Sequence, residues 1–455
     1  MINVAPSRKT IDEALARLTP EYIEQVQHNL THPRRGVPDY QVSAMYSNRR
    51  ILGLMADTSA CGYYRIFLPL QLLKMHGAYT EARSVCGPAD IRLFDDIIAP
   101  RQHNQEIGEL LNLAIWEGRK VWYELDDDLD HISTMSPAYP VYHMGTESLS
   151  NINKVMTSCL GLTVSTPPLA KWYSRQMSNV AVIDNYIDFS IRDWSVDVEW
   201  TPTGPLFHPK PIKRPERWGD KIVIGYSCGN THQEDWLEHG KSIAAVLRKY
   251  PQVLFVLYSS PQVQRDFSII ADLPMDQVEF QSAAHFLDHP EGLQGMDIQI
   301  APLACNQFNL CKTALKAYES FAAGAAFVGS KVGPYAHLHK RAGGDKLVLV
   351  GKGAHAYSSW MEALSYLIEN HEERKAMANR AREWVIANQS MEANFHVWPA
   401  SWDAMWNRVT SGIVGKPKNI KSPKEYMSYG AYDRSDNCPV DPSTTYKKGY
   451  FPAYG

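Results

Sequence analysis

Short apolar runs alternate with longer amphipathic segments along most of this chain. A short apolar run predicts a buried strand, whereas apolar residues that recur every three or four positions predict a helix. Strands that alternate with helices predict a parallel sheet, because parallel neighbours need long crossover connections. The predicted strands are residues 51–55, 91–99, 120–125, 160–165, 180–184, 221–226, 253–258, 277–281, 297–303, 325–329 and 347–350. The predicted helices are residues 63–75, 106–116, 169–177, 232–250, 309–324, 355–370 and 371–387.

A proline-rich stretch divides this alternation into two halves. Residues 192–220 combine five prolines with polar residues, which is typical of a linker. Near the end of the chain, Trp398, Trp402 and Trp406 recur every fourth residue, which predicts a helix with a buried stripe. The predicted segments are an N-terminal helical extension over 1–48, α/β domains over 49–191 and 221–390, a linker over 192–220, a closing helix over 391–410 and an extended tail over 411–455.

The predicted helix over residues 309–324 carries the most informative chemistry. Asn309 suits its N-cap, and Gly324 suits the position just past its last turn. Lys312, Lys316 and Glu319 fall on one helix face. Free N–H groups and two lysines near a helix start favour an anion, and a carboxylate farther along the same face can bind sugar hydroxyls. The pattern therefore indicates a nucleotide-sugar site, and the alternative is an ordinary solvated face.

This stretch resembles the donor-binding helix of GT-B glycosyltransferases, in particular the retaining family four, whose motif is Glu, seven residues, Glu. Glu319 matches the second Glu, which in that family holds the nucleotide ribose. Cys311 takes the place of the first Glu, which contacts the donor sugar. The pattern Asn-x-x-Lys-x-x-x-Lys-x-x-Glu also resembles a subgroup from bacterial glycan clusters and bacteriophage genomes. The resemblance extends over residues 50–410.

The resemblance implies an α/β fold of the GT-B class, with two Rossmann-like, doubly wound parallel-sheet domains that face each other across a cleft. Residues 49–191 would then form the acceptor domain, and residues 221–390 the donor domain. The loop after the first strand of the donor domain would face the diphosphate. Its expected donor-binding residues are Ser227, Asn230, Thr231 and His232, although the same residues also suit an ordinary capped turn. Asn309, at the predicted start of the motif helix, is expected to bind the donor as well.

The first-domain loop over residues 57–65 would lie on the other side of this cleft. It lacks the G-x-G-x-x-G pattern of dinucleotide sites. Gly62 allows close approach to a ligand, and Arg65 can bind a phosphate with two hydrogen bonds or pair with a local carboxylate. Asp57, Tyr63 and Tyr64 are the expected acceptor contacts, because aromatic rings can stack on a sugar or a base.

Three consecutive acids, Asp126, Asp127 and Asp128, follow a predicted strand. Asp-x-Asp is the metal-binding signature of the other glycosyltransferase architecture, GT-A. In GT-B enzymes, cationic side chains and helix dipoles take the place of the metal, so we expect no metal site. The resemblance instead places these acids beside the acceptor, as catalytic or acceptor-binding groups. A solvated acidic loop is the alternative.

Composition limits the other classes of function. The chain has 455 residues, 44% of them hydrophobic, and a formal net charge of −3, so a strong general attraction to nucleic acid is not expected. Its seven cysteines show no metal-ligand spacing, which favours a reducing, cytoplasmic location. There is no apolar run of membrane-spanning length.

Together these features predict a glycosyltransferase that moves a hexosyl or pentosyl group from a nucleotide-diphosphate sugar to an acceptor hydroxyl, with retention of configuration and no cofactor. Lys312, Lys316 and Arg65 would stabilise the leaving diphosphate. The acceptor class stays open between a glycan, a lipid-linked acceptor and nucleic acid. Alternatives are a phage-type enzyme that glycosylates a hydroxymethylated DNA base, a non-catalytic nucleotide-sugar or glycan-binding module, and an epimerase or phosphorylase. The DNA alternative relies on basic residues at Arg34, Arg35, Arg49, Arg50, Lys416, Lys418, Lys421 and Lys424.

Overall fold

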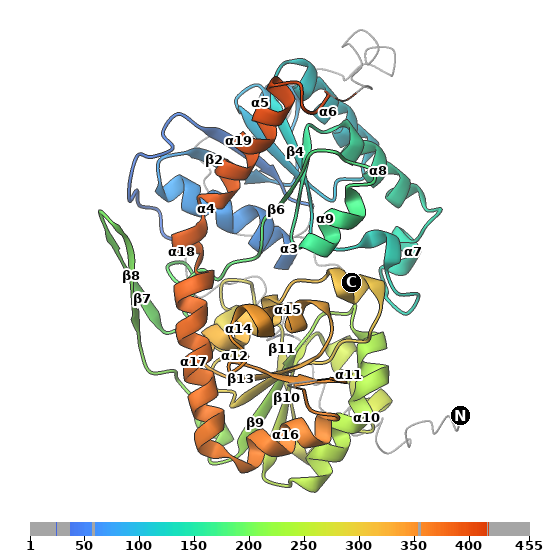
Figure 1. Ribbon diagram of the computed structural model, residues 1–455, viewed down its shortest axis with the longest axis vertical. Helices are drawn as coiled ribbons and strands as arrows, with labels where there is room; N and C mark the ends of the chain where they lie inside the picture. Colours follow the sequence, from blue (N-terminus) through green and yellow to red (C-terminus); the bar gives the residue numbers. More distant parts are fainter. Residues whose placement is uncertain (1–23, 25–36, 57–59, 354–355, 416, 418–455) are drawn as a thin grey trace.

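The computed structural model describes residue 24 and residues 37–56, 60–353, 356–415 and 417. Two six-stranded sheets dominate it, one in each half of the elongated molecule (Figure 1). All neighbouring strands within these two sheets are parallel, and helices flank both sheets. The predicted α/β fold with two doubly wound parallel sheets is therefore confirmed.

The first sheet has the strand order β2-β1-β3-β4-β5-β6. Its strands are β1 (Arg50–Leu54), β2 (Tyr79–Arg83), β3 (Asp96–Pro100), β4 (Lys120–Leu125), β5 (Gly161–Val164) and β6 (Val180–Val182). Its helices are α3 (Ala60–Gly62), α4 (Leu68–Met75), α5 (Pro88–Ile91), α6 (Gln105–Trp116), α7 (Tyr139–Tyr142), α8 (Glu147–Ser158) and α9 (Pro167–Tyr173). One wide π-helical turn, Tyr63–Phe67, joins α3 to α4. The strand predicted over residues 91–99 begins only at Asp96, because α5 ends at Ile91 and a turn follows it; the first part of that prediction was therefore wrong.

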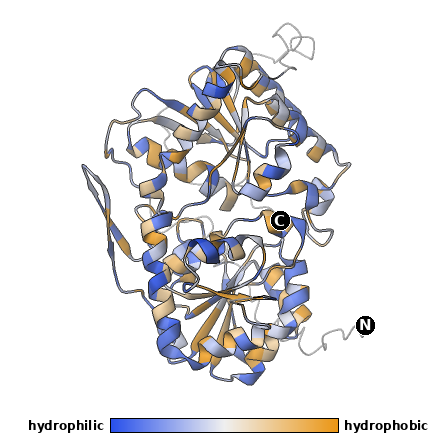
Figure 2. Ribbon diagram, viewed as in Figure 1, coloured by the Kyte–Doolittle hydropathy of each residue, from blue (hydrophilic) through white to orange (hydrophobic). Residues whose placement is uncertain are grey.

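The second sheet has the order β11-β10-β9-β12-β13-β14. Its strands are β9 (Ile222–Ser227), β10 (Val253–Ser259), β11 (Val278–Ser282), β12 (Ile298–Ala301), β13 (Ala326–Ser330) and β14 (Val348–Val350). Its helices are α10 (Gln233–Lys249), α11 (Pro261–Ala271), α12 (His289–Leu293), α13 (Gln307–Cys311), α14 (Leu315–Ala322), α15 (Gly333–Arg341), α16 (Trp360–Glu369) and α17 (His371–Gln389). The central strands of both sheets are largely hydrophobic, as expected for sheets covered on both faces (Figure 2).

The predicted single helix over residues 309–324 is instead two helices, α13 and α14. The N-cap is Asn306, whose side-chain oxygen accepts a hydrogen bond from the Asn309 amide at 2.8 Å, so the prediction of Asn309 as the cap was wrong. The helix breaks because the Cys311 carbonyl accepts a hydrogen bond from the Thr166 hydroxyl at 2.7 Å, rather than from an amide one turn later. Gly324, with φ of +71°, follows the last turn as predicted.

The chain passes between the two halves at two adjacent places. Ile187 and Ser390 form a parallel bridge, and the amide of Met391 donates to the Ile187 carbonyl at 2.7 Å. Within the predicted linker, β7 (Val196–Thr201) and β8 (Gly204–Pro209) form an antiparallel hairpin. Beyond α17, helices α18 (Met391–Asn394) and α19 (Val397–Thr410) return to the first half (Figure 1).

The tryptophan stripe lies on α19. Trp398 and Trp402 are each 1% exposed and belong to the same hydrophobic cluster as the first sheet, as predicted. Most of the predicted extension over 1–48 and tail over 411–455 lies outside the described residues, and so does Asp57. None of the described helices has both the length and the apolar character that a membrane crossing needs.

Candidate functional site

The loops after the strands of the two sheets meet in the middle of the molecule. Thr166, which follows β5, donates to the Cys311 carbonyl, and the side-chain amide of Asn185 donates to the Thr313 hydroxyl at 3.1 Å. Ligands of doubly wound sheets bind at the carboxyl ends of the strands. The candidate site therefore lies where these two sets of strand ends face each other.

Lys316 lies against the loop that follows β9. Its Nζ donates to the Ser227 carbonyl at 2.7 Å. Burial lowers the pKa of Lys316, and the neighbouring charge of Lys312 acts in the same direction. A bound anion would counter both effects, because it favours the charged ammonium. Within the same loop, Asn230 is exposed and Thr231 is partly exposed.

His232 is held beside this lysine by a buried carboxylate. Its Nδ1 lies 2.7 Å from Asp235 Oδ2, and Asp235 Oδ1 accepts from the Asn309 side-chain amide, also at 2.7 Å. Burial, together with the charges of Lys316 and Lys312, lowers the pKa of His232 to about 4. The imidazole is therefore neutral near pH 7, and Nδ1 donates to Asp235. Asn309, predicted to bind the donor, is buried and lies behind Asp235.

Glu319 is the carboxylate at the other end of this cluster. Its Oε1 accepts from the Tyr64 hydroxyl at 2.7 Å and lies 3.3 Å from His289 Nε2. Burial alone would raise the pKa of Glu319, but His289, Arg192 and Lys316 outweigh it and lower the pKa to about 2. Glu319 is therefore an ionised acceptor at neutral pH.

Lys312 lies at the C-cap of α13 rather than on α14. The predicted single face with Lys316 and Glu319 was therefore wrong in its geometry, because the intervening residues leave the helix. Lys312 and Glu319 still lie close enough to Lys316 for their charges to influence its pKa. The ammonium of Lys312 lies 4.4 Å from the centre of the Phe308 ring. Lys312, at the break between α13 and α14, therefore influences both Lys316 of its own domain and Asp127 of the first domain.

Arg65 is only 1% exposed and pairs with a local carboxylate, which is one of its two predicted roles. Its Nε donates to Glu124 Oε1 at 2.8 Å, and its Nη1 donates to the Ile183 carbonyl at 2.6 Å. Tyr63 and Tyr64 are also buried, and the Tyr63 hydroxyl donates to Asp188 at 2.9 Å. Gly62, just before them, is buried as well. The hydroxyls of both tyrosines are thus engaged within the protein.

The three acids after β4 have different surroundings. Asp126 lies 3.8 Å from Arg101 Nε. Burial raises the pKa of Asp127, and the charge of Lys312, from the second domain, opposes that rise. Asp128 is fully buried; its Oδ2 lies 2.9 Å from His131 Nδ1, whereas its Oδ1 has no hydrogen-bond partner among the described residues. The acids are therefore not one solvated loop.

Cys61, Asp126 and Asp127 also form the group of described residues with metal-site spacing, since their potential ligand atoms lie within 4.8 Å of one another. Mg²⁺ and Mn²⁺ prefer oxygen ligands, and a thiol suits them poorly. The fit to the divalent ions of phosphate chemistry is therefore weak.

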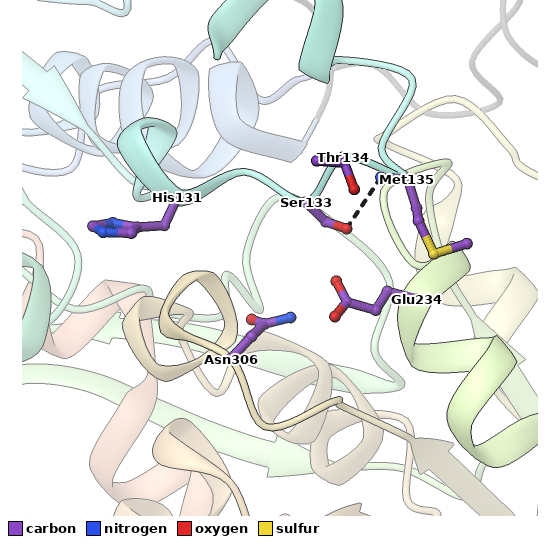
Figure 3. A pocket seen from close by; sticks show the side chains of 6 residues that line it. All are labelled: His131, Ser133, Thr134, Met135, Glu234 and Asn306. Atoms are coloured by element: carbon purple, nitrogen blue, oxygen red, sulfur yellow. Dashed lines mark hydrogen bonds between the residues drawn. The ribbon is translucent and has the colours of Figure 1, made fainter. Parts of the chain in front are cut away.

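A pocket of about 290 Å³ is lined by residues of both domains. Ser133 and Thr134 of the first domain face Glu234 and Asn306 of the second domain across it (Figure 3). These four residues were not predicted. Their polarity carries no periodic signal, and only the meeting of the two domains brings them together.

Two of the arginines proposed for DNA binding are engaged in ion pairs. Arg49 pairs with Asp403, and Arg50 donates to Asp95 through Nε at 3.1 Å and Nη2 at 2.9 Å. The other basic residues proposed for DNA lie outside the described residues.

Comparison with known proteins identifies the fold. No protein-family model matches the chain, and no curated protein matches it either. Solved structures do match. HepE from Anabaena, in complex with UDP and glucose, has a TM-score of 0.53 and 13% identity, covering 78% of this chain and all of its own. A glycosyltransferase from Rickettsia africae has a TM-score of 0.54 and 10% identity, covering 79% of this chain and 99% of its own. Sucrose-phosphate synthase from Thermosynechococcus elongatus has a TM-score of 0.51 and 12% identity, covering 79% of this chain and all of its own. The chain therefore has the two-domain GT-B fold that these structures share.

Proposed function

We propose that this protein is a glycosyltransferase that transfers a hexosyl or pentosyl group from a nucleoside-diphosphate sugar to an acceptor hydroxyl, with retention of configuration and without a resident metal. The observation that carries the proposal is the charge arrangement at the strand ends. Lys316 donates to the Ser227 carbonyl at 2.7 Å in the loop after β9, and the charges of Lys312 and of the ionised Glu319 both act on it. The likeness to HepE, whose structure contains UDP and glucose, supports this ligand class.

The cations suit the leaving group. Cleavage of the bond between the sugar and the diphosphate leaves negative charge on the diphosphate, and fixed cations stabilise that charge. Lys316 lies against the Ser227 carbonyl, and Lys312 lies at the helix break. Because the lysines are already in place, little reorganisation is needed as the charge develops. Glu319 would accept hydrogen bonds from the ribose hydroxyls.

The acceptor side is the pocket between the domains. Glu234 and Asn306 offer an acceptor and a donor of hydrogen bonds, and Ser133 and Thr134 offer hydroxyls. Such a lining suits an acceptor rich in hydroxyl groups, such as a glycan. The charge of Lys312 acts on Asp127, so this acid is near enough to the proposed cations to serve as an acceptor contact.

The first test is a thermal-shift panel of nucleotide-sugars on the full chain. A true donor at a hundredfold excess over its dissociation constant should stabilise the protein by about 2.7 kcal/mol. Lys316→Ala should abolish that shift, whereas Lys154→Ala, on the exposed surface of α8, should retain it. A panel in which no nucleotide-sugar stabilises the protein would contradict the proposal.

The second test separates an enzyme from a binding module. Incubation with the donor should release nucleoside diphosphate, and release should accelerate when a hydroxyl acceptor is added. Release that needs inorganic phosphate would indicate a phosphorylase. Binding without any release would indicate a non-catalytic module. NMR of the product should show the same anomeric configuration as the donor.

A further inference from the structure

The carboxylate of the second domain, Glu319, is held by a side chain of the first domain. Tyr64 lies in the π-helical turn after β1, whereas Glu319 lies on α14. The Tyr64 hydroxyl, which is buried, donates to Glu319 Oε1 at 2.7 Å. The two domains are thus linked at the same carboxylate that the proposed function assigns to ribose binding.

The direction of this hydrogen bond is fixed by Arg192. Arg192 Nη2 donates to the Tyr64 oxygen at 2.6 Å, and a guanidinium cannot accept a hydrogen bond. The only hydroxyl proton of Tyr64 is therefore free to point at Glu319. Arg192 is itself fixed by Asp188, with 2.9 Å between Nε and Oδ1. Burial keeps the pKa of Tyr64 well above its usual value, so the hydroxyl remains a donor.

A second donor reaches the same oxygen from α12. Tyr258 accepts from the Ala284 amide at 2.9 Å, and its own proton is available to His289 Nδ1 at 3.3 Å. From this pattern we assign the other ring nitrogen, Nε2, as the donor to Glu319. Oε1 thus receives two protein donors. Oε2 has no hydrogen bond from the described residues and is the oxygen left for a ligand.

We propose that Tyr64, fixed by Arg192, is a positioning residue that orients Glu319 toward the ribose hydroxyls of a nucleoside diphosphate. The donor site of the second domain is then completed by the first domain. This inference rests on the proposed function, because it assumes a nucleoside diphosphate as the ligand. It adds a role for Tyr64 that differs from the acceptor stacking expected from the sequence.

The test combines removal of the Tyr64 hydroxyl with removal of the ribose hydroxyls and asks whether the two losses of affinity depend on each other. UDP affinity is measured by calorimetry for the unmodified protein and for Tyr64→Phe, and the pair of measurements is repeated with 2′,3′-dideoxy-UDP. If UDP does not bind, then GDP, ADP and CDP are used in turn with their dideoxy counterparts. Tyr64→Phe should weaken binding of the ribose form about tenfold, the loss typical of one hydrogen bond to a charged group. It should change binding of the dideoxy form less than twofold.

Tyr318→Phe is the matched control. Tyr318 lies next to Glu319 on α14, and its hydroxyl donates across the domains to Asp184 Oδ2 at 3.0 Å, but it does not bond to Glu319. This variant should bind both nucleotides as the unmodified protein does. Melting of each variant without nucleotide checks that it is folded.

The outcomes separate the two proposals. Equal losses for the ribose and dideoxy forms, no loss in Tyr64→Phe, or an equal loss in Tyr318→Phe would each overturn the positioning role while leaving the donor class intact. An unmodified protein that binds none of the four nucleoside diphosphates would overturn the proposed function, and this inference with it.

Discussion

At the scale of single residues, the site is built from charges that are held before any ligand arrives. His232, Asp235 and Asn309 form a buried chain of hydrogen bonds behind the loop after β9. Asp235 also accepts from the Ala304 amide at 2.7 Å. Burial acts to raise the pKa of Asp235, but hydrogen bonding to His232 opposes burial, and the pKa is lowered overall. This carboxylate therefore anchors both the imidazole and the start of the segment that leads to α13.

Replacement of Asp235 tests that anchoring. Asp235→Asn replaces one carboxylate oxygen with an NH2 group, which then faces a hydrogen-bond donor of the protein and cannot accept from it. We therefore expect the free energy of unfolding to fall by about 2 kcal/mol. Urea denaturation near pH 7 measures the change. Glu238→Gln, an exposed change on the same helix, should stay within about 0.5 kcal/mol of the unmodified protein. Equal stabilities for the two variants would refute the anchoring role.

The trio of Cys61, Asp126 and Asp127 leads to a prediction about metals. Because lysines supply the proposed stabilising charge and a thiol suits Mg²⁺ poorly, we expect glycosyl transfer to proceed at an unchanged rate after treatment with EDTA. Assays with EDTA, and with added Mg²⁺ or Mn²⁺, measure this. Activity that is lost with EDTA and restored by Mn²⁺, but not restored in Asp126→Asn, would instead make the trio a metal site.

At the scale of elements, tertiary contacts decide what periodicity cannot. Apolar runs located most of the strands, but β2 was missed because its sequence, Tyr-Thr-Glu-Ala-Arg, is polar and lies at a sheet edge. The hairpin of β7 and β8 was missed inside a stretch that its prolines marked as a linker. The break between α13 and α14 depends on Thr166, a residue from the other domain. The partners of Glu319 and Arg65 likewise lie far away in the sequence, so only their residue types were predictable.

The close packing of α15 against α13 gives a prediction at this scale. A Cβ on Gly333 would lie 2.8 Å from the Leu310 carbonyl oxygen and 2.9 Å from the Leu310 Cα, both of them backbone atoms. Gly333→Ala must therefore shift α13, which ends beside Lys312. We expect a loss of about 2 kcal/mol in unfolding free energy, as for an overpacked core, together with weaker nucleotide binding.

Gly415→Ala is the control, because a Cβ there would meet no atom of the described residues within 4 Å. Its unfolding free energy and nucleotide affinity should remain close to those of the unmodified protein. Denaturant unfolding and calorimetry measure both quantities. A Gly333→Ala protein with unchanged stability and affinity would show that α13 tolerates displacement.

At the scale of the whole molecule, the two chain crossings meet at a buried carboxyl group. Glu392 Oε1 accepts from the Phe189 amide at 2.8 Å and from the Ser190 amide at 2.6 Å, whereas Oε2 is buried without a hydrogen-bond partner among the described residues. Burial and the nearby charge of Asp188 raise the pKa of Glu392 to about 7. The hydrogen bonds from Ser190 act in the opposite direction but are outweighed.

This shift predicts how stability depends on pH. Because the folded pKa lies above the usual value of 4.5, the folded protein binds more protons between those values, and the contribution of Glu392 to stability falls as pH rises from about 4.5 to 7. The total effect is on the order of 3 kcal/mol. Glu392→Gln cannot ionise and should become more stable relative to the unmodified protein as pH rises through this window. Unfolding at pH 5 and pH 8 tests this, and an equal difference at both values would contradict it.

The return of α19 to the first sheet has a consequence for synthesis on the ribosome. The Asn179 side-chain amide donates to the Met405 carbonyl at 3.2 Å, and Trp398 and Trp402 complete the core of a domain whose strands end at Val182. That domain is translated before the second sheet, but its covering helix α19 is translated only after the second sheet is complete. A nascent chain halted after the second sheet would present bare apolar surface, which is the kind of surface that chaperones recognise.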